Sequence, residues 1–252
     1  MRFDVITLFP EMIARAASYG VTGKAIERRM VRLGLWNPRD YTTDKRRTVD
    51  NRPYGGGPGM VMMVQPLRQA IQAAKAADPG PVRVVYLSPQ GVPLRQADFI
   101  RFSTQERILM IAGRYEGIDQ RLLETDVDEE WSLGDYVISG GELAALVVID
   151  GVTRLLPKVL GAEESSQQES FMQGLLDHPH YTRPDRIDGQ AVPEVLQSGD
   201  HAEIERWRLK QSLGWTMLRR PELLEKLELS DEQKILLHEL ISEQKTMKRS
   251  KP

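Results

Sequence analysis

The segment RILMIAGRYEGID (residues 107–119) indicates the fold most directly, because an apolar run ends there in a glycine-rich turn. The run RILMIA (107–112) is typical of a strand buried on both faces. Two further runs, FDVITLF (3–9) and VRVVYLS (82–88), are also rich in apolar and β-branched residues. The sequence therefore predicts a sheet that contains these three strands.

Helical spacing of apolar residues separates and follows these runs. Helices are predicted from Glu11 onward and over residues 66–77, 97–102, 119–124 and 142–156. A further helix is predicted over residues 24–33, ending at Gly34. Strands that alternate with helices indicate an α/β domain with a mostly parallel sheet and helices on both faces.

Glycine-rich turns follow three of the predicted elements: SPQG (88–91), GRYEG (113–117) and the middle of WSLGDYVISGGEL (131–143). Ligands of parallel sheets bind at the carboxyl ends of the strands, so these loops are predicted to form one pocket. None of them spells the G-x-G-x-x-G dinucleotide fingerprint. Their glycines would let backbone groups approach a flat ligand such as adenine, although turns without any ligand account for them equally well.

Residues 39–63 are predicted to form a long, loop-like insertion around YGGGPG (54–59). The loop lacks the Lys-Ser/Thr pair of a P-loop, which argues against a nucleoside triphosphate site. Arg46, Arg47 and Arg52 flank it and favour contact with substrate phosphates. A solvated run of charges is the alternative interpretation.

The last third of the chain differs in character. Residues 157–170 are polar, and the amphipathic segments 200–213, 221–227 and 230–243 predict a small all-helical domain. We therefore expect an α/β domain over residues 1–160, a linker over 161–170 and a helical domain over 171–252. A basic stripe on these helices would either bind phosphates or take part in amphipathic helix packing. The stripe comprises Arg206, Trp207, Arg208, Lys210, Arg219 and Arg220.

Composition limits the other possibilities. The 34 basic residues nearly balance 36 acidic ones, so any nucleic-acid surface must be local. Cysteine is absent, which excludes disulfides and suits a reducing cytoplasm. The N-terminal residues resemble neither a signal peptide nor a membrane span, so we expect a cytoplasmic protein with no membrane partner. His178 and His180 lie near Asp177 without metal-site spacing, and no metal site is predicted.

Ordered motifs along the chain resemble one family, the bacterial tRNA (guanine-37-N1)-methyltransferases of the trefoil-knotted SPOUT class. The motifs are DVITLFPEM (4–12), RPYGGGPGMVM (52–62), YLSPQG (86–91), GRYEGID (113–119), EEWSLGDYVISGGEL (129–143), GLLDHPHYTRP (174–184) and HAEIERWRLKQSLG (201–214). The resemblance implies a deep trefoil knot in the α/β domain and a homodimer. It also implies methyl transfer from S-adenosylmethionine to ring N1 of the tRNA guanosine at position 37, beside the anticodon, which supports reading-frame maintenance. The family is further associated with Mg²⁺.

The same resemblance assigns the methyl donor to residues of the three strand-end loops, many of them acting through backbone groups. These residues are Tyr86, Leu87, Ser88, Pro89, Gly113, Glu116, Leu133, Gly134, Tyr136, Ile138, Gly140 and Gly141. The helical domain would bind the anticodon stem-loop of tRNA.

Catalysis would need two further groups, because N1 of neutral guanine carries a proton and O6 gains charge when that proton leaves. The family pattern supplies Arg154 as the cation. The family's base is an aspartate in a run like E-D-S-F, and this chain has Glu169 there, which keeps the carboxylate one methylene further out. Glu169 is the predicted base, and Glu163 and Glu164 are the alternatives. Ala144 and His178 stand where proline and cysteine are usual.

Two other functions stay open at this point. One is a catalytically silent RNA-binding protein with the same fold, which the departure at Glu169 favours. The other is a related knotted enzyme that methylates ribosomal RNA or another tRNA position. Binding of the donor and the position of the methylated nucleotide would distinguish them.

Overall fold

A computed structural model describes residues 1–161 and 169–249, with side chains in the last helix described as far as Glu243. The chain divides into two compact units, Met1–Glu163 and Glu164–Pro252. Unit 1 holds a parallel sheet, and unit 2 is mainly helical. No helix among the described residues is long and apolar enough to cross a membrane.

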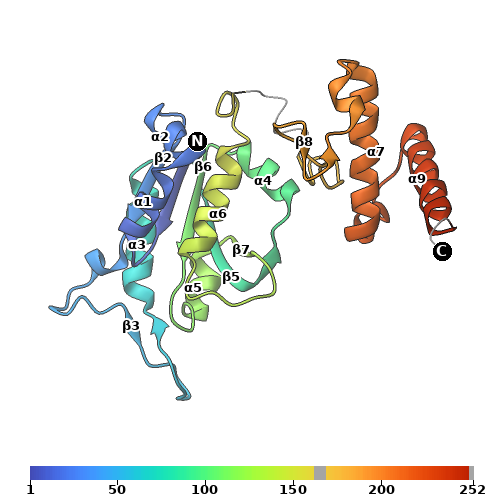
Figure 1. Ribbon diagram of the computed structural model, residues 1–252. Coiled ribbons are helices and arrows are strands. Elements are labelled where there is room, and N and C mark those ends of the chain that lie inside the picture. The colour runs from blue at the N-terminus through green and yellow to red at the C-terminus, as the bar shows by residue number, and fades with distance from the viewer. Residues whose placement is uncertain (162–168, 250–252) are drawn as a thin grey trace. The chain divides into compact units, whose positions relative to one another are not determined.

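The sheet of unit 1 has the strand order β2-β1-β6-β5-β7, and every neighbouring pair is parallel (Figure 1). Its strands are β1 (Arg2–Ile6), β2 (Arg32–Trp36), β5 (Arg83–Pro93), β6 (Arg107–Ala112) and β7 (Glu129–Ser132). β6 lies between β1 and β5 and is buried along its whole length. The predicted parallel α/β fold is confirmed. The knot stays a prediction.

Helices cover both faces of this sheet. On one face pack α1 (Pro10–Ala17), α2 (Gly20–Glu27), α4 (Gln96–Ser103) and α6 (Glu142–Thr153). On the other face pack α3 (Val64–Ala76) and α5 (Gln120–Asp126). Alternate residues of β6 serve the two layers: Ile108 and Met110 face α6, whereas Leu109 and Ile111 face α3. Each such side chain contributes roughly 1.5–3 kcal/mol by its burial.

The helix predicted over residues 24–33 is confirmed only as far as Glu27, and its second half is wrong. Helix α2 ends at Glu27, Arg29 has a left-handed backbone (φ 59°), and the chain then enters β2. Leu33 and Leu35 pack with the α6-side core, while Trp36 packs with the α3-side core. The spacing of apolar residues up to Leu33 is compatible with a helix as well as with a short edge strand. Pairing with β1 fixes residues 32–36 as a strand.

The insertion over residues 39–63 contains more structure than predicted. A short 3₁₀ helix η1 (Pro38–Tyr41) precedes an antiparallel hairpin of β3 (Asp50–Asn51) and β4 (Val61–Met62). The glycine-rich tip between these strands includes Tyr54, whose side chain is almost completely exposed. The hairpin extends away from the sheet in Figure 1.

A buried ionic cluster lies near the amino ends of β1 and β6. The Asp4 carboxylate accepts hydrogen bonds from Arg2 (2.8 and 2.9 Å), Trp36 (2.9 Å) and Arg107 (2.8 Å). Arg107 also donates to backbone carbonyls that follow α3 and lie within it. Burial opposes ionisation of Asp4, but these donors outweigh it and lower the pKa of its carboxyl group.

Unit 2 is built around α7 (His201–Arg219), α8 (Pro221–Leu224) and α9 (Asp231–Arg249), with a short 3₁₀ helix η3 (Glu194–Gln197). Its small core contains Leu175, Leu213 and Leu236. Ser230 and Gln233 form a capping box before α9: the N–H of Gln233 donates to the Ser230 hydroxyl (3.2 Å), and the N–H of Ser230 donates to the Gln233 side chain (2.9 Å). A two-residue-per-strand hairpin, β8 (Arg186–Ile187) with β9 (Gln190–Ala191), adds strand structure that the apolar spacing did not predict.

Candidate functional site

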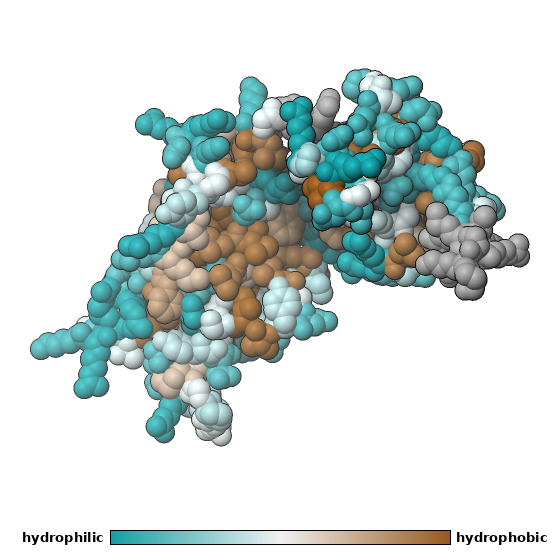
Figure 2. Space-filling model, in the orientation of Figure 1, coloured by the Kyte–Doolittle hydropathy of each residue, from teal (hydrophilic) through white to brown (hydrophobic). Residues whose placement is uncertain are grey.

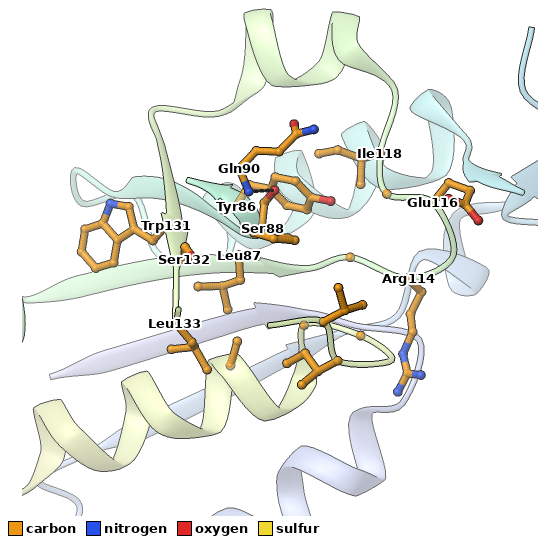
Figure 3. Close-up of a pocket in the computed structure, with 18 of the residues that line it drawn as sticks. Tyr86, Leu87, Ser88, Gln90, Arg114, Glu116, Ile118, Trp131, Ser132 and Leu133 are labelled. Carbon is orange, nitrogen blue, oxygen red and sulfur yellow. Dashed lines mark hydrogen bonds between the residues drawn. The ribbon is translucent and has the colours of Figure 1, made fainter. Parts of the chain in front are cut away.

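The three strand-end loops of unit 1 surround one pocket of about 420 Å³ (Figure 3). The walls come from β5, from the loop after β6 and from the loop between β7 and α6. This volume is within the range of small-molecule sites. The three loops therefore converge on one pocket, as predicted, and the pocket is large enough for a small molecule.

The first wall is a bulge within β5 rather than a turn that ends the strand. β5 pairs with β7 at Leu87, and the pairing resumes at Val92 after a register shift. The Ser88 hydroxyl accepts a hydrogen bond from the backbone N–H of Gln90 (3.2 Å; Figure 3). Residues 88–90 are thereby displaced from the ladder and line the pocket.

The second wall, residues 113–118, lies against the ring of Tyr86. A Cβ on Gly113 would be 2.7 Å from the Tyr86 hydroxyl oxygen, so only glycine fits without a shift. Burial, assisted by the charge of Glu130, raises the pKa of the Tyr86 phenol, which therefore stays protonated at neutral pH. Tyr86 contributes a neutral hydroxyl and an aromatic edge to this part of the pocket.

The same wall is attached to the glycine-rich hairpin of residues 50–62. The backbone N–H of Glu116 donates to the Met60 carbonyl (2.9 Å), and the N–H of Met62 donates to the Gly117 carbonyl (3.0 Å). A Cβ on Gly59 would lie 2.3 Å from a carboxylate oxygen of Glu116. The predicted substrate-facing loop therefore starts at the rim of the pocket.

The third wall, residues 133–141, depends on backbone geometry. Gly134 has φ 146°, which side-chain-bearing residues rarely adopt, and its N–H donates to the Ser132 hydroxyl (3.1 Å). The N–H of Gly141 donates to the Gly113 carbonyl (2.9 Å), and a Cβ on Gly141 would lie 2.7 Å from the Cα of Ala112. Close approach of two backbones thus accounts for Gly141 with or without a ligand.

Every residue that the resemblance assigns to the methyl donor lines this pocket, from Tyr86 and its neighbours to Gly141. Whether they hold the donor stays a prediction. Sequence reasoning did not assign several other lining residues, although some of them belong to the quoted motifs. These are Gln90, Arg114, Tyr115, Gly117, Ile118, Gln120, Leu123, Trp131, Ser132, Val137, Ser139 and Ala144.

Arg154 does not line the pocket of its own chain. It caps the carboxyl end of α6, whereas the pocket lies at the amino end of that helix. Twelve residues separate it from Glu142, which corresponds to about 18 Å along the axis. Arg154 instead lines a shallow groove on the outer face of α4 and α6, together with Phe99 and Val147.

Glu169 lies in unit 2, in a turn in which its backbone carbonyl accepts a hydrogen bond from the N–H of Met172 (3.2 Å). Its neighbour Phe171 has a left-handed backbone (φ 71°). Glu169 lines a small cavity of about 160 Å³ beside Glu205 and Arg208. The alternative bases, at positions 163 and 164, lie outside the described residues.

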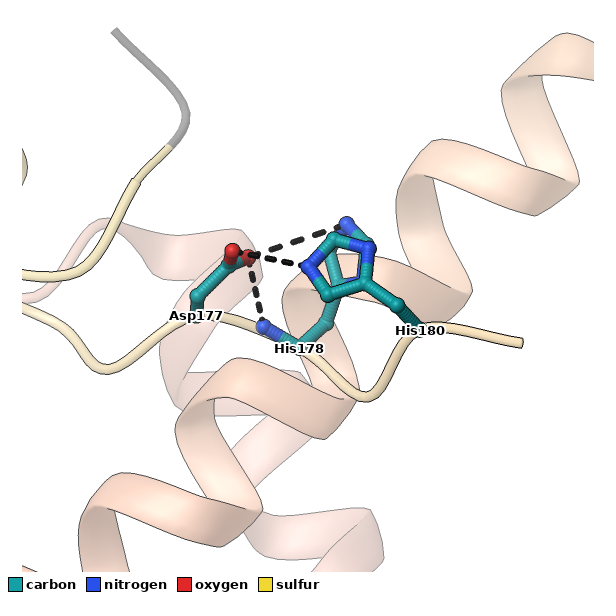
Figure 4. Close-up of side chains that lie close together, drawn as sticks. All are labelled: Asp177, His178 and His180. Carbon is teal, nitrogen blue, oxygen red and sulfur yellow. Dashed lines mark hydrogen bonds and ion pairs between the residues drawn. The ribbon is translucent and has the colours of Figure 1, made fainter. Parts of the chain in front are cut away.

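Asp177, His178 and His180, for which no metal site was predicted, lie close together in unit 2 (Figure 4). One ligand atom from each lies within 4.8 Å of the others. Asp177 accepts the N–H of His178 (2.7 Å) and contacts Nε2 of His180 (2.9 Å). These hydrogen bonds account for the arrangement without a cation.

The basic stripe of unit 2 already has acidic partners. Arg206 pairs with Glu239 (2.7 Å), and Lys210 pairs with the same carboxylate (3.0 Å). The Trp207 ring lies 6.3 Å from the ring of Tyr181. Amphipathic packing therefore accounts for this part of the stripe, and a role in binding phosphates stays a prediction.

These features define an α/β protein with a small-molecule pocket at the carboxyl ends of its parallel strands. The chain belongs to the TrmD family of tRNA (guanine-1)-methyltransferases, whose family model matches residues 1–226. This membership confirms the family inferred from the motifs and its SPOUT fold class. As a member of a methyltransferase family, the chain requires a methyl donor.

Similar proteins cover nearly the whole chain. The tRNA (guanine-N(1)-)-methyltransferase of Methylococcus capsulatus is 63% identical over 240 residues, which are 92% of this chain and 95% of that protein. The protein of the same name from Halorhodospira halophila is 59% identical over 249 residues, covering 99% and 94%. That of Aeromonas hydrophila is 59% identical over 243 residues, covering 96% and 98%.

Proposed function

We propose that this chain transfers a methyl group from S-adenosylmethionine to ring N1 of guanosine 37 in tRNA, in the cytoplasm, and so supports reading-frame maintenance. The observation that carries the proposal is the coincidence of family membership with the pocket. All residues assigned to the donor by motif converge on one cavity. Relatives at 58–63% identity bear the name tRNA (guanine-N(1)-)-methyltransferase.

The chemistry of the pocket suits this donor. Leu87, Leu133 and Ile138 offer apolar contact, while the glycine backbones of the second and third walls leave amide and carbonyl groups accessible to an adenine edge. When bound, S-adenosylmethionine supplies an electrophilic methyl carbon. The protein's task is then to hold the guanine N1 in line with that carbon and to exclude water.

Proton transfer is assigned to Glu169 and charge stabilisation to Arg154. In this proposal the Glu169 carboxylate accepts the N1 proton, so the N1 electron pair is free to bond to the methyl carbon. The carbon–sulfur bond of the donor would break in the same step, and its electrons would remain on the sulfur as a neutral thioether. The Arg154 guanidinium donates hydrogen bonds to O6, where negative charge develops. Both assignments rest on matched positions in the motif pattern, and the two residues belong to different units.

A homodimer would give Arg154 a route to a pocket. The face of unit 1 that carries α4 and α6 has apolar side chains at its surface (Figure 2), including Ile100, Leu143 and Val147, each 40–48% exposed. Arg154 lines the groove on this face. Arg154 is about 15 Å along α6 from Ala144, which lines the pocket of its own chain. We therefore propose that a second copy packs on this face and that Arg154 reaches the pocket of that copy.

The decisive experiment is methyl transfer from radiolabelled S-adenosylmethionine to unmodified tRNA with guanosine or adenosine at position 37. Transfer to the guanosine substrate alone, mapped to N1 of position 37, is expected. Transfer to another nucleotide or to ribosomal RNA would favour the related knotted enzyme. Calorimetry without detectable donor binding would favour the silent RNA-binding protein. The magnesium dependence implied by the resemblance stays an expectation.

A further inference from the structure

A buried carboxylate lies directly behind the third wall of the pocket. Glu142, the first residue of α6, is completely buried and accepts a hydrogen bond from the Thr7 hydroxyl at the end of β1 (2.8 Å). Its other oxygen accepts from Nε of Arg114 (2.8 Å). A buried carboxylate is costly unless such partners compensate it. The amino end of α6 also favours a negative charge at this position.

Arg114 connects this carboxylate to the pocket. It follows β6, lines the pocket, and donates through Nη1 to the carbonyl of Ser139 in the third wall (3.0 Å). Figure 3 shows its side chain leaving the loop in a different direction from Glu116. A Cβ on Gly140 would lie 2.2 Å from Nε of Arg114, so the guanidinium lies against bare backbone.

The end of β1 completes the arrangement. The Thr7 hydroxyl that donates to Glu142 also accepts the N–H of Phe9 (2.9 Å), and the guanidinium of Arg114 lies 4.5 Å from the centre of the Phe9 ring. Three separate elements, β1, β6 and α6, therefore converge on one carboxylate. The outer part of the third wall lacks comparable burial, since Tyr136 and Val137 are exposed.

We propose that Glu142, Arg114 and Thr7 are positioning residues that hold the 133–141 loop in the shape that binds the methyl donor. The identity of that ligand rests on the proposed function. Glu142 orients Arg114, Arg114 fixes the Ser139 carbonyl, and the backbone groups around Gly140 are thereby presented to the pocket. None of the three needs to touch the reacting atoms.

Calorimetric titration with S-adenosylmethionine and hydrogen exchange of the free protein test this role. Glu142→Gln keeps the shape but removes the charge, and is expected to raise the donor Kd about tenfold and to speed exchange of the 133–141 amides. Thr7→Val is expected to raise Kd about threefold. In steady state the donor KM should rise while kcat changes less. Wild-type affinity and exchange in both variants would overturn the proposal.

A double-mutant cycle separates positioning from general destabilisation. If Glu142 acts through Arg114, the double variant Arg114→Gln with Glu142→Gln should bind the donor no more than about twofold more weakly than Arg114→Gln alone. Fully additive losses would overturn the coupling. Asp126→Asn is the matched control: it breaks the Arg68–Asp126 pair (2.8 Å) outside the pocket and should leave donor Kd unchanged.

The outcomes remain distinguishable from those of the proposed function. If the wild-type chain does not bind S-adenosylmethionine, the proposed function fails, but the exchange rates of the free protein still decide whether Glu142 and Thr7 order the loop. If Glu142→Gln does not fold, Thr7→Val carries the test, because it removes only the two hydrogen bonds of the Thr7 hydroxyl and leaves the Arg114–Glu142 ion pair in place.

Discussion

The pocket of unit 1 is assembled from backbone that a parallel sheet holds in place, whereas Glu169 of unit 2 contributes a single side chain from a turn. In the pocket, hydrogen bonds such as Gly141 to Gly113 join neighbouring walls. The Glu169 turn is supported by local bonds of its own unit. We therefore expect donor binding to tolerate changes in unit 2, while chemistry should depend on both units.

The largest expected effect is on the proton acceptor. Glu169→Gln should lower the single-turnover rate of methyl transfer about 10²–10⁴-fold, because the amide cannot accept the N1 proton. Donor Kd should not change. Glu169→Asp should retain substantial activity. Glu205→Gln, which alters another carboxylate of the same small cavity, is the control. A nearly normal rate in Glu169→Gln would contradict the assignment.

Arg154 comes next. Arg154→Met should lower kcat about 10²-fold through loss of charge stabilisation at O6, with donor Kd again unchanged. Mixing this variant with Glu169→Gln chains extends the test, since activity regained in the mixed dimer would mean that the two residues act from different copies. Arg101→Met removes a partly exposed cation of α4 that pairs with Glu129 (3.2 Å), and it should have little effect on kcat.

A change in the pocket wall should affect donor binding, which the two preceding variants leave unchanged. Gly141→Ala places a Cβ against the backbone of Ala112, which should weaken donor binding and lower the free energy of unfolding by about 1–3 kcal/mol. Calorimetry and urea unfolding measure the two quantities. Gly80→Ala is the matched control, because the nearest atom to its Cβ would be 3.8 Å away. Normal donor affinity in Gly141→Ala would show that the third wall can shift freely.

The smallest effect concerns pH and lies away from both regions. The pKa of Asp4 is lowered in the folded state, so its stabilisation is fully present above the unfolded pKa of about 3.9 and is lost as pH falls through the folded value. Between pH 7 and pH 3 the unfolding free energy should fall by up to about 1.3 kcal/mol more in wild type than in Asp4→Asn, because pH 3 lies only about 0.9 unit below the unfolded pKa. Urea unfolding at both pH values measures the two free energies, and an equal fall in wild type and Asp4→Asn would contradict this prediction.

Much of the fold could be predicted from local pattern. The strand over residues 107–112 matches β6 residue for residue, because a strand buried on both faces has a continuous apolar run. The edge strand β2 could not be predicted in this way: half of its surface is open, and pairing with β1 outweighs its local helical spacing. The β5 bulge also differs from the predicted turn because its shape depends on pairing with β7.

The candidate site likewise combines features that the sequence predicts with features that only the tertiary structure decides. The residue pattern alone is sufficient for the family, the parallel α/β layers and the grouping of the three loops, because strand ends of a parallel sheet must meet at one edge. The predicted helix over residues 142–156 also puts Arg154 near the end far from these loops. Tertiary packing is needed to bring Glu142, Arg114 and Thr7 together behind the pocket. Contacts between side chains far apart in sequence depend on how the helices and strands pack, which no local motif encodes.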